Sequence, residues 1–362
     1  MQVRDILRAL DSRYALAKAA SWDKVGLQIG DENAPVSRVL VAHEINDVVL
    51  DEASDCQCIV IYHPLIFRAL ENLNFQNHTA RLAAQCIARG LNVIALHTAL
   101  DHAPQPGALG DHLARSLSLE NISILKPDGY EALVKIVVFV PDENLREVQN
   151  AMWEAGAGQI GNYDCASFRS SGTGTFRPNA QANPHIGSSG ELEQVEEWRL
   201  EVIAPQSSQN QIVAAMKAAH PYEEVAYDVI SLQNQGEGYG AARVGTLKQP
   251  LSLREYATQV EGELQAPSVR LVETKTQVQK IACVPGSGAS YISAAVRAGC
   301  DCLVTGDIKH HDALQAKASG LSIIDVTHTA TERATIGMLA EALETLDVEV
   351  VRSKVEINPF VS

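Results

Sequence analysis

Two stretches of this sequence, residues 90–101 and 320–332, are near copies of one another although more than 200 residues separate them. Each begins with Gly-Leu, continues as the short apolar run typical of a buried strand, and ends in His-Thr-Ala followed by a carboxylate. In both copies the carboxylate stands four residues after the histidine. The pairs are His97 with Asp101 and His328 with Glu332. A chain that carries this strand-and-histidine device twice is expected to build two similar halves.

The sequence around both copies alternates apolar runs with helical segments, which predicts mostly parallel sheets covered by helices. A second match joins residues 54–64 to residues 298–308. We therefore predict a pseudo-symmetric α/β core built from two half-sheets with polar residues at the strand ends. In the second half we expect one strand over 321–330, one long helix over 332–346 and a last strand over 348–353.

The middle of the chain follows a different order. From about 126 to 245 the apolar runs and helical segments read β-α-β-β-α-β, with a turn-rich stretch over 171–190. This is the order of the ferredoxin-like split arrangement. The predicted organisation is a first half-core over 1–125, an inserted ferredoxin-like α+β domain over 126–245, and a second half-core over 246–362.

Composition and charge limit the classes of partner that this chain is expected to bind. The formal net charge is −15 without a Lys/Arg cluster, which argues against a nucleic-acid partner and would repel anionic membranes. No stretch approaches the roughly 20 apolar residues of a membrane-spanning helix, so no membrane partner is expected. The N-terminus reads as an amphipathic helix and the seven cysteines are an odd number, which predicts reduced thiols and a cytoplasmic location.

The two histidine-and-acid pairs are the main candidates for a metal site. His63, His97 and His328 each follow a predicted strand, at the edge where functional groups gather in open α/β sheets. Asp101 and Glu332 stand one helical turn beyond their histidines and would share a face with them. Imidazole and carboxylate together are common ligands of zinc, iron and manganese. Two such devices that meet across a pseudo-twofold axis would hold up to two divalent ions and a water of lowered pKa.

Each of these residues also has a simpler interpretation, because a lone histidine at a strand end is more often solvated or hydrogen-bonded than a metal ligand. The paired spacing and the third histidine favour the metal site. Further along, Asp307, His310, His311 and Asp312 could support ligands or contact a substrate, or the two histidines could be merely solvated. The turn over 285–290 is either an anion cradle or a plain tight turn.

Several motifs resemble those of a known protein family. The chain resembles the Ngg-interacting-factor-three-like proteins, which are also catalogued as GTP cyclohydrolase I type-2 homologues. The resemblance covers nearly the whole chain, and its middle matches the longer bacterial members. The matching segments are residues 21–30, 62–67, 97–101, 304–314 and 328–332 in the core, and 156–168, 172–178 and 219–228 in the middle.

The resemblance implies an α/β core that holds two divalent metal ions in a central cavity. Position by position, the implied ligands are His63, Asp101, His328 and Glu332, with the two carboxylates as bridges. His97 would be a ligand or an immediate support. For the middle segment the resemblance implies a PII/CutA-like trimerising fold, and for the whole protein a homohexamer.

The chain departs from the family pattern at two places. Where the family has two consecutive histidines before a proline, this chain has Tyr62 followed by His63. Where the family has Leu-Asp, this chain has His43 and Glu44. Tyr62 could ligate a ferric ion as a phenolate or only hydrogen-bond a metal-bound water, and His43 could take over the missing role.

Two functions of different classes follow. The first is a metal-dependent, cyclohydrolase-like hydrolase acting on a small molecule, such as a nucleotide or another heterocycle, with His97 or His311 moving the proton. The second is a metal-binding hexameric assembly without turnover, which senses ligands through the insert.

Overall fold

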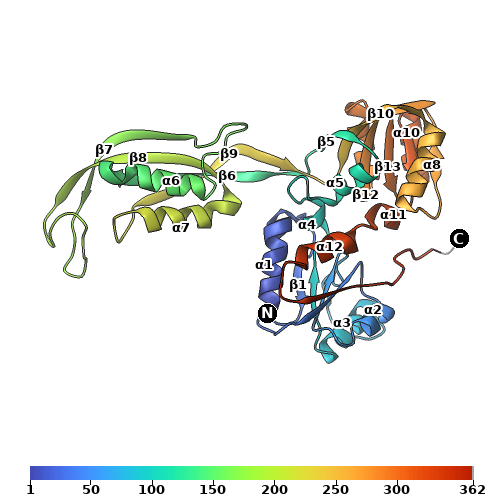
Figure 1. Ribbon diagram of the computed structural model, residues 1–362, viewed down its shortest axis with the longest axis horizontal. Coiled ribbons are helices and arrows are strands. Elements are labelled where there is room, and N and C mark those ends of the chain that lie inside the picture. Colours follow the sequence, from blue (N-terminus) through green and yellow to red (C-terminus); the bar gives the residue numbers. More distant parts are fainter. Residues whose placement is uncertain (361–362) are drawn as a thin grey trace. The chain divides into compact units, whose positions relative to one another are not determined.

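The computed structural model describes residues 1–360 and divides into two compact units (Figure 1). One unit joins Met1–Gly129 to Tyr239–Ser362, and the other is Tyr130–Gly238. The second unit lies inside the predicted 126–245 insert, and the flanking parts of the chain build one common body.

The core unit contains two sheets that share an order. The first runs β1-β4-β3-β2-β15 and the second β11-β14-β13-β12-β10-β5. In each, an antiparallel edge strand is followed by three parallel strands. This agrees with the two matching halves that the sequence predicts. The strands are β1 Gly26–Ile29, β2 Arg38–Ala42, β3 Cys58–Ile61, β4 Asn92–Ala95, β5 Glu120–Ile124, β10 Arg243–Ser252, β11 Arg270–Val272, β12 Gln277–Ser287, β13 Cys302–Gly306, β14 Ser322–Asp325 and β15 Glu349–Arg352.

Helices cover both faces of both sheets, which is why their central strands are apolar on both sides. On the first sheet, α1 and α12 pack against one face and α2 and α3 against the other. On the second sheet, α5 and α8 cover one face and α9 and α10 the other. The helices are α1 Val3–Tyr14, α2 Asp47–Glu52, α3 His78–Ala88, α4 Thr98–Asp101, α5 Leu109–Ser116, α8 Leu253–Leu264, α9 Ile292–Arg297, α10 His310–Ala318, α11 His328–Glu332 and α12 Thr335–Leu343.

The C-terminal part of the chain differs from the expectation in two ways. The predicted strand over 321–330 ends at Asp325, because Thr327 adopts a φ of 76° that an extended strand does not allow. The predicted helix over 332–346 begins only at Thr335, after the short helix α11. The last strand, β15, then crosses back and pairs in parallel with β2 of the first sheet.

The insert has the element order β-α-β-β-α-β and the sheet order β7-β8-β6-β9. Val138, Val148, Leu200 and Met216 belong to its own buried cluster. Residues 171–176, predicted as turns, are part of β7 and pair with β8. The elements are β6 Gly129–Pro141, α6 Leu145–Glu154, β7 Ser167–Phe176, β8 Glu193–Pro205, α7 Gln209–Ala219 and β9 Tyr227–Tyr239.

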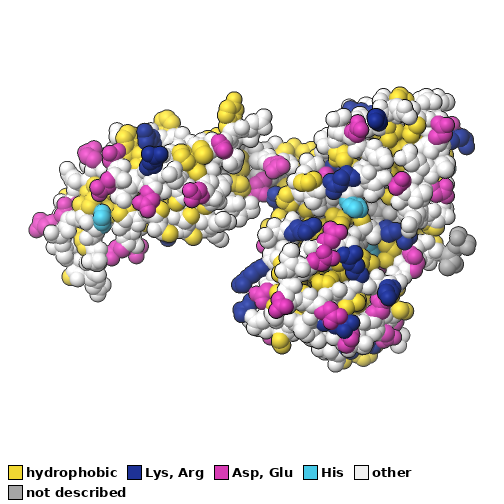
Figure 2. Space-filling model, in the orientation of Figure 1, with side chains coloured by type: hydrophobic (Ala, Val, Ile, Leu, Met, Phe, Trp, Pro, Cys, Tyr) yellow, Lys and Arg dark blue, Asp and Glu magenta, His cyan; other side chains and the backbone are white. Residues whose placement is uncertain are grey.

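Charge is spread over the surface. Figure 2 shows acidic and basic side chains interspersed on the displayed face of each unit, without a broad basic area. Within residues 1–360, no helix combines the length and the apolar character that crossing a bilayer requires.

A buried ion pair joins α5 to β10 in the core unit. Arg243 Nη2 lies 3.1 Å from Asp111 Oδ2, and the two side chains are only 1% and 3% exposed. Arg243 Nη1 also donates to the carbonyl oxygen of Gly240. The pair ties the second sheet to the helix that follows the first copy of the histidine device.

We expect Asp111→Asn to lower the free energy of unfolding by about 3–5 kcal/mol, because it leaves the guanidinium of Arg243 buried without its counter-charge. Urea unfolding followed by circular dichroism measures the loss. The matched control is Glu273→Gln, which removes the exposed partner of Arg254 and should cost less than about 1 kcal/mol. Equal effects of the two substitutions would contradict the prediction.

Candidate metal centre

Four histidines meet where parallel strands end. His43 follows β2, His63 follows β3, His97 follows β4, and His328 comes three residues after β14. The ring centroid of His63 lies 4.5 Å from that of His43, 5.5 Å from that of His97 and 5.6 Å from that of His328. The carboxyl ends of the strands therefore collect imidazoles from both sheets at one point.

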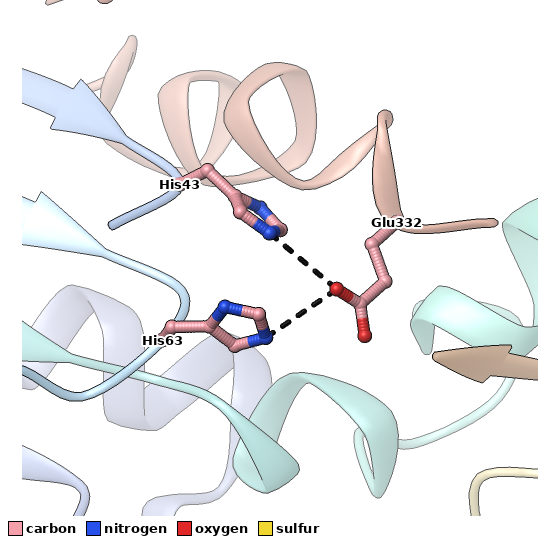
Figure 3. Close-up of side chains that lie close together, drawn as sticks. All are labelled: His43, His63 and Glu332. Atoms are coloured by element: carbon pink, nitrogen blue, oxygen red, sulfur yellow. Dashed lines mark ion pairs between the residues drawn. The ribbon is translucent and has the colours of Figure 1, made fainter. Parts of the chain in front are cut away.

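Glu332 lies at the centre of this group. Its Oε2 is 3.4 Å from His43 Nε2 and 3.4 Å from His63 Nε2, and its Oε1 is 3.1 Å from His328 Nε2. Figure 3 shows the rings of His43 and His63 pointing toward this carboxylate. The residue is 3% exposed. One buried carboxylate is thus shared by imidazoles that come from three different strand ends.

Two atoms of this group are buried and lack hydrogen bonds. They are His43 Nε2 and Glu332 Oε2, which lie 3.4 Å apart without hydrogen-bond geometry. Buried polar atoms are usually satisfied, and an orphaned one costs about 1–3 kcal/mol. A cation between them would satisfy both atoms. Across residues 1–360, His43, His63 and Glu332 are the group whose ligand atoms all lie within 4.8 Å of one another.

Carboxylates orient two of the histidines. His97 Nδ1 lies 2.9 Å from Asp23 Oδ1, and His328 Nδ1 lies 2.7 Å from Asp307 Oδ2. In each case Nε2 is left as the atom that can bind an ion, which is the usual support of a metal-ligating histidine. The repeated device therefore includes a second carboxylate on each side.

Backbone strain gathers at the same place. His97 has a φ of 34°, Asp307 of 58° and Thr327 of 76°, and none of them is glycine. Such conformations cost on the order of 1–3 kcal/mol each and persist where the surrounding fold imposes them. The strand ends are held in the shape that brings the imidazoles together.

Tyr62 and Asp101 form a buried pair beside the histidines. Tyr62 Oη donates to Asp101 Oδ1 over 3.0 Å, and the two residues are 1% and 8% exposed. Burial raises the pKa of Tyr62 well above its ordinary value, and the neighbouring Asp101 adds to the rise. Burial also raises the pKa of Asp101 to about 6. In the structure Tyr62 is thus a hydrogen-bond donor to Asp101, a partner that the sequence did not suggest.

The charges around Glu332 are those of an ion-binding site. Burial opposes ionisation of Glu332, but the close imidazoles of His328, His43 and His63 hold the pKa of this carboxyl well below its usual range. Burial lowers the pKa of His43, which keeps this imidazole neutral. Glu332 and Glu44 outweigh burial at His63 and raise its pKa to about 9. Glu332 is therefore ionised beside a protonated His63, and a cation that binds both side chains would have to displace the proton of that imidazole.

Not every residue singled out in the sequence joins the cluster. His63, His97, Asp101, His328 and Glu332 lie in it or against it. His310 and His311 are exposed at the start of α10 and line neither cavity beside the cluster. Asp312 accepts a hydrogen bond from the backbone of Lys309 and so caps that helix.

The turn over 285–290 packs directly against Glu332. A Cβ added at Gly286 would meet Glu332 Oε1 at 2.5 Å, and the residue has a φ of 62°. Its amide donates to Thr331 Oγ1 over 2.7 Å. Residues 285–287 are the end of β12 and residues 289–291 form a short 3-10 helix. Glycine is required at position 286 for space and for backbone conformation.

Two residues of the site were not among the ligands expected from the sequence. The sequence presented His43 as a departure from the family pattern that could take over the missing role, and it did not point to Asp23. The signal for His43 was its place directly after a predicted strand, the same place as that of the other three histidines. Asp23 stands in a loop that local patterns do not connect to a strand end 74 residues away.

Two cavities flank the cluster within the core unit. One, of about 860 Å³, is lined by Trp22, Tyr62, His97, Asp101 and Glu332 among others. The other, of about 420 Å³, is lined by His43, His63, Arg270 and Asp307 among others. His328 lines both, so the cluster is reachable from two sides.

Comparison with known proteins shows to which family this chain belongs. The sequence profile of Duf34/NIF3 (NGG1p interacting factor 3) matches residues 1–359. The chain belongs to the Duf34/NIF3 family. Among bacterial relatives of this NIF3-family chain, the "GTP cyclohydrolase 1 type 2 homolog" of Halalkalibacterium halodurans is 40% identical over 351 residues, covering 94% of each protein. That of Bacillus subtilis is 37% identical over 365 residues, covering 99% of this chain and 97% of the relative.

Solved structures agree with the family fold. A Bacillus cereus protein related to NIF3 superposes with a TM-score of 0.88 at 37% identity, covering 100% of this NIF3-family chain and 99% of that one. A Staphylococcus aureus protein superposes with a TM-score of 0.76 at 30% identity, with the same coverage. The α/β architecture is thus that of the NIF3 fold.

We expect Glu332→Gln to remove most bound metal and to leave the fold intact, because glutamine keeps the size and loses the charge that the histidines surround. Elemental analysis beside circular dichroism tests this. Glu341→Gln is the matched control, since Glu341 is exposed on the next helix, α12. Unchanged metal content in Glu332→Gln would exclude Glu332 as a ligand.

We expect Tyr62→His to raise the number of divalent ions bound per chain from fewer than two towards two. A neutral imidazole can bind an ion without the cost of deprotonating a phenol whose ordinary pKa is about 10. Isothermal titration of metal into stripped protein measures the change. Tyr62→Phe is the control, because it removes the hydroxyl and adds no ligand. Two tightly bound ions in the unaltered protein, with no gain in Tyr62→His, would refute the prediction.

Proposed function

We propose that this protein is a metal-dependent hydrolase-like enzyme that acts on a small molecule at a divalent metal centre. The observation that carries the proposal is the buried carboxylate of Glu332, shared by three histidines and left, like His43 Nε2, without a hydrogen bond for Oε2. Relatives named "GTP cyclohydrolase 1 type 2 homolog" agree with a nucleotide or other heterocycle as the substrate class.

The donor set fits zinc, iron or manganese, because it mixes imidazole and carboxylate. We assign a first position to His43, His63 and Glu332. A second position, and with it a dinuclear centre, would draw on Asp101 and His328. A bound divalent cation supplies Lewis-acid polarisation of a substrate oxygen and lowers the pKa of water.

The chain's own residues orient and transfer protons. Asp23 fixes one nitrogen of His97, so the other ring nitrogen is the one available to exchange a proton with a molecule in the cavity. Thr98 donates to Asp23 from its amide over 3.0 Å and keeps that carboxylate in place. Of the two histidines expected to move protons, His97 lies in the 860 Å³ cavity, and we do not give exposed His311 this role.

Several finer properties belong to the same proposal. We propose a homohexamer located in the cytoplasm, with the chain divided at about 126 and 245 and the insert built as a PII/CutA-like domain. All seven cysteines are free thiols, which suits a reducing compartment. The mixed surface charge in Figure 2 and the net charge of −15 suit a small-molecule substrate better than nucleic acid.

One observation favours the second class of function, a metal-binding assembly without turnover that senses ligands through the insert. Tyr62 Oη donates a hydrogen bond to Asp101 Oδ1, so one oxygen of this proposed ligand already has a partner. A centre that fills only one position would bind metal and lack the second cation for hydrolysis.

Metal analysis followed by turnover assays tests the proposal. We expect at least one zinc, iron or manganese ion per chain, and hydrolysis of a nucleotide, phosphoester or cyclic amide that is lost on chelation and restored by the metal. Glu332→Gln should abolish that activity, while Glu341→Gln should not. Bound metal with no turnover on the whole panel would favour the assembly without turnover.

We expect the insert to fold and trimerise by itself, because its four strands and two helices surround their own buried cluster. Residues 126–245 expressed alone should give a helical and sheet-containing circular dichroism spectrum and a trimer mass by light scattering. An unfolded or strictly monomeric product would contradict this expectation.

A further inference from the structure

Two exposed aromatic rings pack against a histidine of the cluster. Trp22 is 57% exposed and Phe67 is 45% exposed. The ring centroids are 5.9 Å apart for Trp22 and Phe67, 6.0 Å for Trp22 and His97, and 6.2 Å for Phe67 and His97, all edge to face. Single exposed apolar side chains are ordinary, but two large rings gathered on one site residue mark a surface that a ligand can cover.

Trp22 lies in the larger cavity beside the cluster. This cavity of about 860 Å³ has the size of a small-molecule pocket, for which the usual range is roughly 300–1,000 Å³. Tyr239 and Tyr291 also line it. Phe67 does not line it and contacts Trp22 from the neighbouring segment, so Phe67 braces the indole ring. The cavity thus combines aromatic surface with the ligand-type residues of the cluster.

The charges of the cavity discriminate between kinds of ligand. Among the described residues that line it, Lys18 is the only Lys or Arg, and its Nζ lies 5.6 Å from the ring centroid of Tyr239. Asp101, Asp128 and Glu332 line the same cavity. A polyphosphate would meet these carboxylates, and apart from Lys18 and the imidazoles of His97, His102 and His328 it would depend on bound cations for attraction. A neutral planar ring meets no such repulsion.

We propose that Trp22, braced by Phe67, stacks a neutral planar heterocycle of nucleobase size in the cavity beside the metal cluster. This inference rests on the proposed function, because it names the substrate class of the same site. Trp22 determines specificity through the face of its indole ring and takes no part in proton transfer or metal binding.

Calorimetric titration of the full chain with adenosine and guanosine tests the proposal, with metal-loaded and metal-stripped protein measured separately. Trp22→Leu should weaken nucleoside binding by about 5- to 100-fold, the loss expected when one stacked base loses its aromatic partner. Trp22→Phe keeps a ring and should lose less than Trp22→Leu. Nucleoside should quench tryptophan emission in the unaltered protein, and Trp22→Phe should abolish that quenching. Metal content should be the same in all three proteins.

Phe75→Leu is the matched control, because Phe75 is 62% exposed and lines neither this cavity nor the other one beside the cluster. It should leave nucleoside affinity unchanged. Nucleoside affinity that does not depend on Trp22, or no nucleoside binding by metal-loaded protein, overturns the proposal. So does a triphosphate that binds more than about tenfold tighter than its nucleoside in both Trp22 variants. Trp22-dependent binding by a protein that holds no metal would instead refute the proposed function and leave this inference standing.

Discussion

The carboxylate of Glu332 is the contact on which the arrangement of the core depends. It is 3% exposed, and its oxygens face His43 and His63 from the first sheet and His328 from its own helix beside the second sheet. Burying a charge is costly unless partners compensate it, so the two sheets must present their strand ends to each other. Gly286 leaves the space that Glu332 Oε1 occupies, and Thr327, with a φ of 76°, ends the segment that leads into α11.

The two halves are alike in framework and unlike in chemistry. Both copies of the device end a central parallel strand, and in both a carboxylate anchors Nδ1 of the histidine: Asp23 for His97 and Asp307 for His328. The copies differ in what the second acid does. Glu332 collects imidazoles, whereas Asp101 accepts a hydrogen bond from the phenol of Tyr62. The two halves therefore share a fold, but the acid of the second half lies among three imidazoles and the acid of the first half is bound to a phenol.

Local sequence patterns predicted most of the fold because strands and helices follow from the spacing of apolar residues. The parallel strands of both halves, the helices that cover them and the β-α-β-β-α-β order of the insert all follow from such spacing. Such spacing predicts the C-terminal strand but not the strand with which it pairs. Pairing of β15 with β2 joins segments more than 300 residues apart. The spacing of apolar residues within a strand does not indicate which other strand it pairs with.

The sequence by itself determined the residue types of the site, because a histidine after a buried strand and an acid one turn later are local features. It therefore identified His63, His97, Asp101, His328 and Glu332. Only the tertiary structure decided that His43 supplies an imidazole beside Glu332, although position 62 holds a tyrosine. It also decided that Asp23 orients His97 and that His311 lies outside the site. The physical reason is that distances between strand ends are set by how the sheets pack, and packing depends on contacts between residues far apart in the chain.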